Sequence, residues 1–375
     1  MTYRIRPAVV GCAIRPAITG RERSLEEIIY DISQAALADA GLTIEDIDGI
    51  VVGCNDQFDG RAISVMMASG PTGGVDRDIM STPSSSEHAF ILGALRVASG
   101  QFRTQLVVAW SPTEVSSMSE AQRLGADPYF HRALPLDELS AHALQASALN
   151  HVWPNAWVFA EAVAVKNRRH AAVAFPNPPA RPEAGPARWP LTERLTTLPV
   201  TGAVAMVLAG EDFVAHRGFA SPAWLRGMGW ATEAAFLGDR DLTTAPALVE
   251  AARQAYAEAG VTDPTAFDVV EITDATGYTE LIAYQALGLA SRTEIAPRMS
   301  DGWFARGGRV PVNLSGGVIA FNPVFCTGMI RIAEIANQVR GRAGPHQVPG
   351  AKLGLAHAGS GFAMQYQSAI VLGAA

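Results

Sequence analysis

An internal repeat is the feature of this 375-residue sequence that most constrains its fold. The stretches ALADAGLTIEDIDGIVV (36–52) and AYAEAGVTDPTAFDVVEI (255–272) are near-copies that differ by one insertion. Each predicts the end of a helix, a glycine stop and a buried strand. A further helix and strand follow later in each half, in residues 88–110 and 326–358. Two similar α/β halves, each a mixed sheet covered by helices, are therefore expected to pack face to face.

Local signals place the first elements of both copies. Ser24 and Glu27 predict a capping box at the start of the first helix, which Gly41 ends. Pro246 lies in the first turn of the second helix, which Gly260 ends. Strands are expected over residues 49–53 and 268–272.

Between the halves the composition changes. Residues 119–196 lose the helix–strand alternation, and six prolines lie between Pro176 and Pro190. The stretch is expected to be a loop-rich insertion. The strand at 203–209 then completes the first half. The predicted organisation is an N-terminal half (1–118 plus 197–220), an inserted loop domain (119–196) and a C-terminal half (221–375).

Charge and cysteine content exclude several classes of function. The net charge is −7, and lysine occurs only at Lys166 and Lys352, so neither nucleic acid nor an acidic membrane is expected as a partner. We expect no signal peptide and no membrane span. Cys12, Cys54 and Cys326 show no CxxC spacing, which disfavours a disulfide framework and a metal site. A cytoplasmic location is the expectation.

Two long motifs carry a family resemblance. FDVVEITDATGYTELIAYQALGL (267–289) and VNLSGGVIAFNPVFCTG (312–328), followed by QVRG and QVPGAKLGLAHAGSGFA, resemble the C-terminal half of the thiolases, specifically the sterol-carrier-protein type. The similarity extends to YRIRPAVVGCAIRP, GALRVASG and KNRRHAAVAFPNP. The resemblance implies an α/β fold, the duplicated five-layered αβαβα thiolase fold with an inserted loop domain.

Thiolases use a nucleophilic cysteine at the N-terminus of a buried helix, where the helix dipole lowers the thiol pKa. Counting back from Gly100 by the family's spacing places Ser84 at that position. Ser84 could simply cap the helix. His88, one turn along, could serve as its base or could be an ordinary packed or solvated side chain.

The resemblance also indicates changes at the other catalytic positions. The family's His-Asp-Cys-Phe element is replaced by residues 273–276, of which Asp274 alone is retained. Its Gly-His-Pro element is replaced by Phe321, Asn322 and Pro323. Asn322 can donate a hydrogen bond to a carbonyl oxygen but cannot move a proton near neutral pH. The chain is thus expected to lack the usual catalytic Cys and His.

One further acid–base candidate follows the last predicted helix. The resemblance places His357 where this thiolase type has a histidine, and the backbone N–H groups of Gly359 and Gly361 could face a developing oxyanion. His357 could instead order its loop. Cys326 is expected to be a small buried residue, and Tyr278 to lie in the core or at its rim rather than act as an acid.

Substrate binding is expected to involve coenzyme A as part of the substrate, with no permanently bound cofactor. Lys166, Arg168 and Arg169 resemble the family's stretch beside the coenzyme A channel and could bind phosphate oxygens. They could equally be a solvated helix face. The sequence contains no GxxxxGK[ST] or HExxH motif.

Three functions remain open. The first is C–C bond cleavage or formation of (retro-)aldol type beside an acyl-CoA thioester, without a Cys nucleophile. The second is a catalytically silent subunit of a heteromeric thiolase complex, and the third is a Ser84-dependent acyltransferase. The resemblance implies a homodimer through edge strands near TQLVVAW and MSTPS, or a heteromer with a small OB-fold and zinc-ribbon protein or with a thiolase paralogue.

Overall fold

The structure is a computed structural model that describes residues 4–18, 23–60, 62–112, 117–175, 187–196 and 199–375. Its strands are β1 (Pro7–Arg15), β2 (Gly49–Gly53), β3 (Asp78–Thr82), β4 (Thr104–Ser111), β5 (Gly202–Gly210), β6 (Ala223–Thr232), β7 (Val269–Ile272), β8 (Leu353–Ser360) and β9 (Tyr366–Gly373). Its α-helices are α1 (Leu25–Ala40), α2 (Asp56–Asp59), α3 (Ser64–Ser69), α4 (Ser86–Ala98), α5 (Met118–Gly125), α6 (Glu138–Val152), α7 (Ala156–Ala174), α8 (Glu211–Arg217), α9 (Pro246–Ala259), α10 (Gly277–Ala286), α11 (Arg292–Ser300), α12 (Gly317–Ala320) and α13 (Thr327–Arg340).

The strands follow the order β3-β2-β4-β5-β1-β6-β9-β8-β7. The first five belong to the N-terminal half and the last four to the C-terminal half. The halves meet at a short seam, where Ala8 pairs with Trp224 and Val9 with Ala223. Each half mixes parallel and antiparallel pairs, as β2 runs parallel to β4 and β4 antiparallel to β5.

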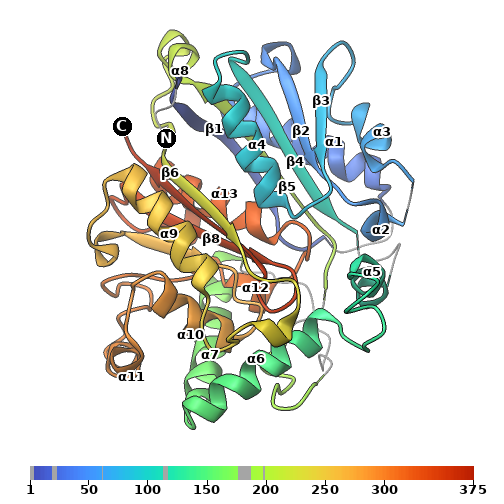
Figure 1. Cartoon of the computed structure of the whole chain (residues 1–375). Coiled ribbons are helices and arrows are strands. Elements are labelled where there is room, and N and C mark those ends of the chain that lie inside the picture. The colour runs from blue at the N-terminus through green and yellow to red at the C-terminus, as the bar shows by residue number, and fades with distance from the viewer. Residues whose placement is uncertain (1–3, 19–22, 61, 113–116, 176–186, 197–198) are drawn as a thin grey trace.

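Helices form three layers around these strands (Figure 1). Helix α1 packs on the outer face of the first half, and α9 packs on the outer face of the second. Between them α4 contacts the first-half strands, α13 contacts the second-half strands, and the two helices contact each other. The five-layered αβαβα arrangement implied by the family resemblance is therefore confirmed.

The repeat is visible in how each outer helix contacts its strand. A Cβ on Gly11 of β1 would lie 2.4 Å from the Ala36 carbonyl oxygen of α1, and a Cβ on Gly227 of β6 would lie 2.2 Å from the Ala255 oxygen of α9. Both glycines follow a register shift in their strand. Each half thus uses a strand glycine to bring a helix backbone into direct contact with the sheet.

A carboxylate bond repeats beside these glycines. The N–H of Cys12 donates to Asp39 Oδ2 at 2.9 Å, and the N–H of Met228 donates to Glu258 Oε2 at 2.9 Å. The acids lie at matching places in the two near-copies, ALADAG and AYAEAG. These side chains satisfy strand N–H groups that the bulges leave out of the ladder.

The inserted segment differs from its expectation. Residues 119–196 were expected to be loop-rich, yet α6, α7 and most of α5 lie within them. Helix α7 packs against α10 and α12 of the C-terminal half. The prolines that suggested a loop follow α7, and all but Pro190 fall within 176–186, outside the described residues.

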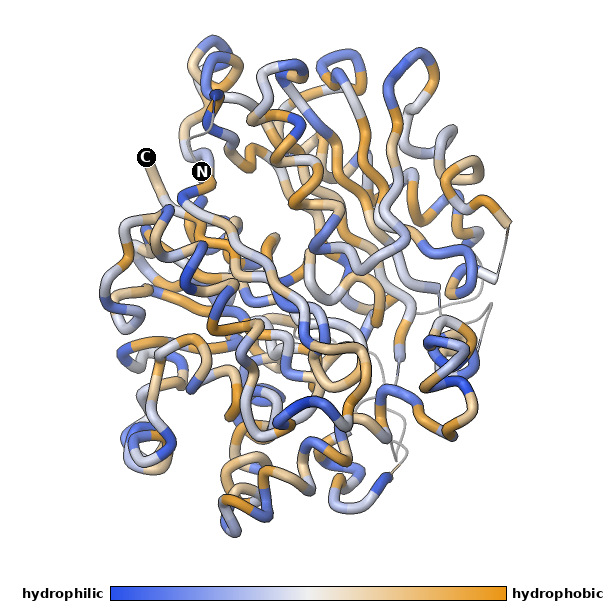
Figure 2. The backbone as a smooth tube through the Cα atoms, viewed as in Figure 1, coloured by the Kyte–Doolittle hydropathy of each residue, from blue (hydrophilic) through white to orange (hydrophobic). Residues whose placement is uncertain are grey.

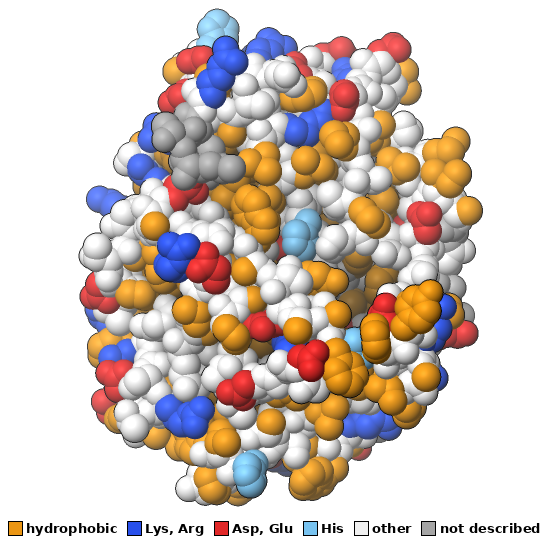
Figure 3. Space-filling model, in the orientation of Figure 1, with side chains coloured by type: hydrophobic (Ala, Val, Ile, Leu, Met, Phe, Trp, Pro, Cys, Tyr) orange, Lys and Arg blue, Asp and Glu red, His pale blue; other side chains and the backbone are white. Residues whose placement is uncertain are grey.

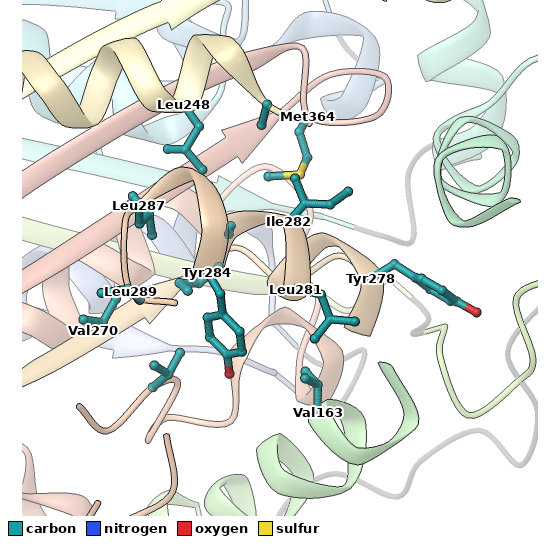
Figure 4. Close-up of a cluster of buried hydrophobic side chains, with 14 of the residues drawn as sticks. Val163, Leu248, Val270, Tyr278, Leu281, Ile282, Tyr284, Leu287, Leu289 and Met364 are labelled. Carbon is teal, nitrogen blue, oxygen red and sulfur yellow. The ribbon is translucent and has the colours of Figure 1, made fainter. Parts of the chain in front are cut away.

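Hydrophobic residues concentrate along the strands and on the helix faces that cover them (Figure 2). On the outer face of the second half, α10 contributes Leu281, Ile282 and Tyr284 to one buried cluster (Figure 4). Among the described residues, no helix combines the length and the apolar character needed to cross a membrane. On the face shown in Figure 3, acidic and basic side chains are interspersed rather than gathered by sign.

Candidate functional site

The N-termini of the two central helices meet at the middle of the molecule. Ser86, the first residue of α4, donates its N–H to the Phe325 carbonyl oxygen at 3.2 Å. Its Oγ accepts the N–H of Met329, in the first turn of α13, at 3.0 Å. Helix N-termini carry partial positive charge, so this junction favours groups that are or become anionic.

Ser84 and His88 come together at this junction. Ser84 lies two residues before α4 and His88 in its first turn, and Ser84 Oγ is 2.9 Å from His88 Nδ1. Ser84 is half-buried, and 27% of the His88 side chain is exposed. The structure therefore forms the hydroxyl–imidazole pair that the sequence suggested and leaves both side chains partly exposed.

Glu87 is a residue that the sequence reasoning missed. Its side chain is 1% exposed, its Oε1 accepts the Ser360 hydroxyl at 3.0 Å, and Oε1 lies 3.7 Å from His88 Nδ1. A Cβ on Gly328 of α13 would lie 2.2 Å from Glu87 Oε2, so only glycine leaves room for this carboxylate. An acid in a first helical turn is common, because it complements the dipole. The sequence therefore gave no signal that this acid is buried between both central helices and β8.

The arrangement differs from a Ser-His-acid triad. In a triad the hydroxyl and the carboxylate contact opposite ring nitrogens of the histidine. Here Ser84 and Glu87 both approach Nδ1. Tyr366 lies edge-on to the imidazole, with ring centroids 6.4 Å apart. The geometry directs Nε2 away from both oxygen groups, where it can accept a proton from a bound molecule.

Asp274 lies in a buried polar network. Its Oδ1 accepts the Val318 N–H at 2.6 Å, and its Oδ2 accepts from Asn167 Nδ2 at 2.6 Å. The same Asn167 nitrogen lies 2.6 Å from Glu280 Oε2. Burial, reinforced by the Glu280 carboxylate, raises the pKa of Asp274 to about 8. Asp274 thus fixes the glycine turn at 316–317 by hydrogen bonds, and it is fully buried.

His357 lies on the opposite face of its strand from the helix junction. Its neighbours Leu355 and Ala369 belong to the cluster on the α9 face, whereas Ala356 belongs to the central cluster. The ring is fully buried, and its Nε2 is 2.8 Å from Gln367 Oε1. Burial lowers the pKa of His357 to about 4. This placement gives no support to His357 as the base and agrees with the alternative, a histidine that orders its surroundings.

Lys166 makes contacts within the protein, so it is not placed to bind a coenzyme A phosphate. Its Nζ is 2.8 Å from Glu280 Oε1 and donates to the Val312 carbonyl oxygen at 3.0 Å. Arg168 donates to the Arg194 carbonyl oxygen, and Arg169 is exposed. Lys166 is therefore engaged in the buried network, Arg168 is half-buried, and Arg169 is the exposed cation of the three.

The remaining candidates lie before α13 and at the end of β8. Asn322 is half-buried, and its carbonyl oxygen accepts the Val200 N–H at 2.9 Å. Gly359 pairs with Gln367 in the β8–β9 ladder, while Gly361 has a φ of 73° and starts the turn after β8. Asn322 lies three residues before Phe325, whose carbonyl oxygen accepts the Ser86 N–H, so its backbone is part of the segment that leads to the helix junction.

The two residues expected to be structural agree with that expectation. Cys326 is fully buried, and burial raises the pKa of its thiol well above the ordinary value. Tyr278 is 1% exposed at the edge of the α10 cluster, where its hydroxyl accepts from Asn150 Nδ2 at 2.9 Å (Figure 4). No three His, Cys, Asp or Glu side chains within the described part of the chain gather in a group able to hold a metal ion.

Comparison with known proteins finds a matching C-terminal domain and relatives that match over part of their length. Residues 230–374 match the family model described as thiolase C-terminal domain-like. Human sterol carrier protein 2 is 35% identical over 172 residues, which cover 42% of this chain and 29% of that protein. The acetyl-CoA acetyltransferase of Methanothermobacter thermautotrophicus is 35% identical over 158 residues, 42% of this chain and 41% of that protein. The matches thus span less than half the length of either relative.

A solved structure matches the whole chain. The structure titled Ltp2-ChsH2(DUF35) aldolase superposes with a TM-score of 0.80 at 23% identity and covers 98% of both chains. At this identity the match establishes the fold. Together with the matched C-terminal domain and the sterol-carrier-protein relatives, it supports a thiolase-superfamily protein of the sterol-carrier-protein type.

Proposed function

We propose that this protein acts on acyl-CoA thioesters and breaks or forms a carbon–carbon bond by a (retro-)aldol reaction, without a cysteine nucleophile. The observation that carries the proposal is the Ser84–His88 pair at the junction of two helix N-termini, with 2.9 Å between Oγ and Nδ1. His88 takes the role of base that the sequence assigned to His357, because it alone of the two lies at this junction.

The cleavage direction requires one base and one site for negative charge. His88 Nε2 accepts the proton of the β-hydroxyl group of a 3-hydroxyacyl-CoA, and that carbon becomes a carbonyl as the Cα–Cβ bond breaks. The electron pair of the broken bond passes into the thioester enolate. The same proton returns from His88 to Cα, which yields a shortened acyl-CoA and an aldehyde or ketone.

The enolate oxygen needs donors that are in place before the reaction. The N-termini of α4 and α13 supply partial positive charge at the junction. The Asn322 amide, in the half-buried segment that leads to α13, is the proposed side-chain donor. The buried thiols support a route without a cysteine nucleophile, because burial raises the pKa of Cys12 and Cys54 to about 12.

The names of the similar proteins support the substrate class and the reaction. One relative is an acetyl-CoA acetyltransferase, and the solved structure that matches the whole chain is titled an aldolase. We propose that Arg169 on α7, which is exposed, contacts coenzyme A phosphates, and that the half-buried Arg168 beside it adds positive charge.

A second candidate function rests on the same contact. Ser84 Oγ bonded to an imidazole nitrogen is also the geometry of an activated serine, so Ser84 could accept an acyl group from coenzyme A. The approach of Glu87 to the same nitrogen favours the first proposal, because a carboxylate there favours a proton on Nδ1, and a protonated Nδ1 cannot accept the Ser84 hydroxyl proton.

The experiment is a product analysis with the purified protein, alone and with proteins that co-purify with it. A panel of 3-hydroxyacyl-CoA compounds is incubated and analysed by liquid chromatography and mass spectrometry. The expected result is a carbonyl product together with a shortened acyl-CoA, from the wild type and from Ser84→Ala at a rate within about tenfold. Acid–base catalysis typically contributes 10²–10⁴-fold, and the loss of a hydrogen-bond partner of the base removes only part of that.

Two other outcomes contradict the proposal. Acylated Ser84 in the intact-mass spectrum, with all activity lost in Ser84→Ala, would establish the acyltransferase. Coenzyme A binding without turnover under any of these conditions would establish a silent subunit.

A further inference from the structure

Two groups with different hydrogen-bonding abilities face Nδ1 of His88. The Ser84 hydroxyl can donate to this nitrogen or accept from it, so it suits either neutral form of the ring. A carboxylate can only accept, and Glu87 Oε1 lies 3.7 Å away. Only Glu87 therefore distinguishes the two tautomers, and its charge favours a proton on Nδ1.

The carboxylate is held at this distance from three sides. Its own residue is part of α4, two places after the helix N-cap. Ser360 of β8 donates to Oε1 at 3.0 Å, and Gly328 of α13 leaves the space that Oε2 occupies. With 1% of its side chain exposed, Glu87 does not reach a substrate, and any influence on the chemistry must pass through His88.

We propose that Glu87 is a positioning residue, which keeps the proton of neutral His88 on Nδ1 and so leaves Nε2 as the proton acceptor. This inference rests on the proposed function for its catalytic meaning, because Nε2 is the atom assigned to the β-hydroxyl proton. The alternative is that Glu87 only fills the space between α4, α13 and β8. The two roles differ in one respect. The positioning role requires the negative charge of Glu87, whereas filling the space does not.

Glu87→Gln separates them, because glutamine keeps the shape and can still accept from Ser360. Long-range ¹H–¹⁵N correlation spectra at pH 8.5 report the tautomer of each of the eight histidines, and His88→Asn assigns the signal. We expect the Nδ1–H form of His88 in the wild type. In Glu87→Gln the ratio of Nδ1–H to Nε2–H falls by roughly threefold to tenfold, the size expected when a full charge about 4 Å from a polar N–H is removed at an effective dielectric constant near 20.

Kinetics supply the second measurement. Glu87→Gln lowers kcat for C–C cleavage by roughly 10-fold to 100-fold and leaves KM nearly unchanged, because the proton acceptor is lost in part while the binding surface is intact. Glu250→Gln on the exposed face of α9 is the matched control, and it is expected to change neither kcat nor KM. Should Glu87→Gln not fold, Ser360→Ala is the second variant. It keeps the Glu87 charge but removes the hydroxyl that holds the carboxylate in place. A smaller fall in the ratio of Nδ1–H to Nε2–H of His88 is then expected.

The outcomes are separable. An unchanged tautomer ratio in Glu87→Gln, or an Nε2–H ring in the wild type, overturns the positioning role even if the protein cleaves 3-hydroxyacyl-CoA. A shifted ratio in a protein that cleaves no substrate supports the role of Glu87 and removes the proposed function.

Discussion

At the scale of single residues, the buried ionisable groups divide into two kinds. Glu87 and His88 lie at the helix junction, where a molecule from solvent can reach the imidazole. Asp274 and His357 are fully buried, and their bonds run to other parts of the protein. A strongly shifted pKa raises the probability that a group is functional but does not establish it. In this protein Asp274 and His357 have shifted pKa values and structural roles.

Asp274 makes the stability of the protein depend on pH. Its pKa is raised to about 8 in the folded chain, against about 3.9 in an unfolded one. Between pH 4 and pH 8 the folded protein therefore holds a proton that the unfolded chain has released, and the free energy of unfolding falls as pH rises through this window. Above about pH 8 this contribution stays constant.

Asp274→Asn removes this dependence. The Oδ1 atom of the new asparagine still accepts from the Val318 N–H. The Asn167 amide can rotate to present its own Oδ1 to the new asparagine, and this atom has no hydrogen-bond partner among the described residues. Urea unfolding at pH 5 and pH 8 is expected to show a smaller loss of stability for the variant, by on the order of 1–3 kcal/mol. Parallel losses in the two proteins would show that Asp274 does not hold the proton.

At Gly317 the addition of a single atom, the Cβ of alanine, is expected to destabilise the protein. Its φ is 67°, and a Cβ would lie 2.2 Å from Asp274 Oδ1. Gly317→Ala is expected to lower the free energy of unfolding by about 2–4 kcal/mol, because it strains the backbone and displaces a buried hydrogen-bond acceptor. Gly307→Ala, which has a similar φ of 81° but nothing within 4 Å, measures the backbone strain alone. Equal effects in the two variants would contradict the role of Asp274.

At the scale of elements, α7 is fastened to the C-terminal half by buried polar side chains. Lys166 and Asn167 both contact Glu280 of α10, and Asn313 Nδ2 donates to the same carboxylate at 2.7 Å. His170 Nδ1 lies 3.1 Å from the Asn313 carbonyl oxygen. These contacts argue that the inserted segment folds with the C-terminal half, although the chain inserts it in the first.

Lys166→Met tests this attachment. The substitution leaves the Glu280 charge buried without its cation, which typically costs about 3–5 kcal/mol. Arg169→Met on the exposed face of the same helix removes the same charge and is expected to change stability by less than about 0.5 kcal/mol. Similar unfolding free energies for the two variants would show that Lys166 is a surface cation after all.

The elements also show what the sequence could and could not predict. The near-copies predicted two similar α/β halves and their helix stops, because glycine caps and apolar periodicity are local properties, whereas the five layers followed from the family resemblance. The face on which His357 lies was not predictable in this way. Both faces of β8 are buried, so its apolar residues do not alternate with polar ones and reveal no orientation.

The surroundings of Lys166 and Glu87 were not predictable either, because they depend on the fold rather than on the local sequence. The run KNRR has the charge of a solvated helix, yet α7 is covered on one side and turns Lys166 inward while Arg169 stays exposed. Ser84 and His88 were predictable because residues four apart meet at a helix start. Glu87 depends on Gly328 and Ser360, more than 200 positions away in the sequence, and only the fold brings them together.

At the scale of the whole molecule, one edge of the sheet is available to a partner. Strand β3 is the last in the order and pairs with β2 alone among the described residues. The stretch TQLVVAW, which was expected near the two-fold axis, forms β4 and is paired on both sides, so it cannot be the edge. Exposed Met80 on β3, with Met66 and Val75 nearby in the chain, gives this edge an apolar surface.

We therefore expect the protein to form at least a dimer through β3, in line with the tendency of unprotected edge strands to pair. Met80→Glu places a charge on this edge and is expected to reduce the molar mass measured by light scattering to that of one 39.6 kDa chain. Tyr30→Glu, at an exposed position on α1, is the control. A wild-type protein that is monomeric at all concentrations would contradict this expectation.

The central claim is that proton transfer at the start of α4, and not at β8, is the chemistry of this protein. The most direct measurement compares the rate of 3-hydroxyacyl-CoA cleavage by His88→Gln and His357→Gln. The account predicts that His88→Gln loses at least about 100-fold in kcat, the lower end of what a general base contributes, while His357→Gln stays within a few-fold of the wild type. Full activity in His88→Gln, or a selective loss in His357→Gln, would contradict it.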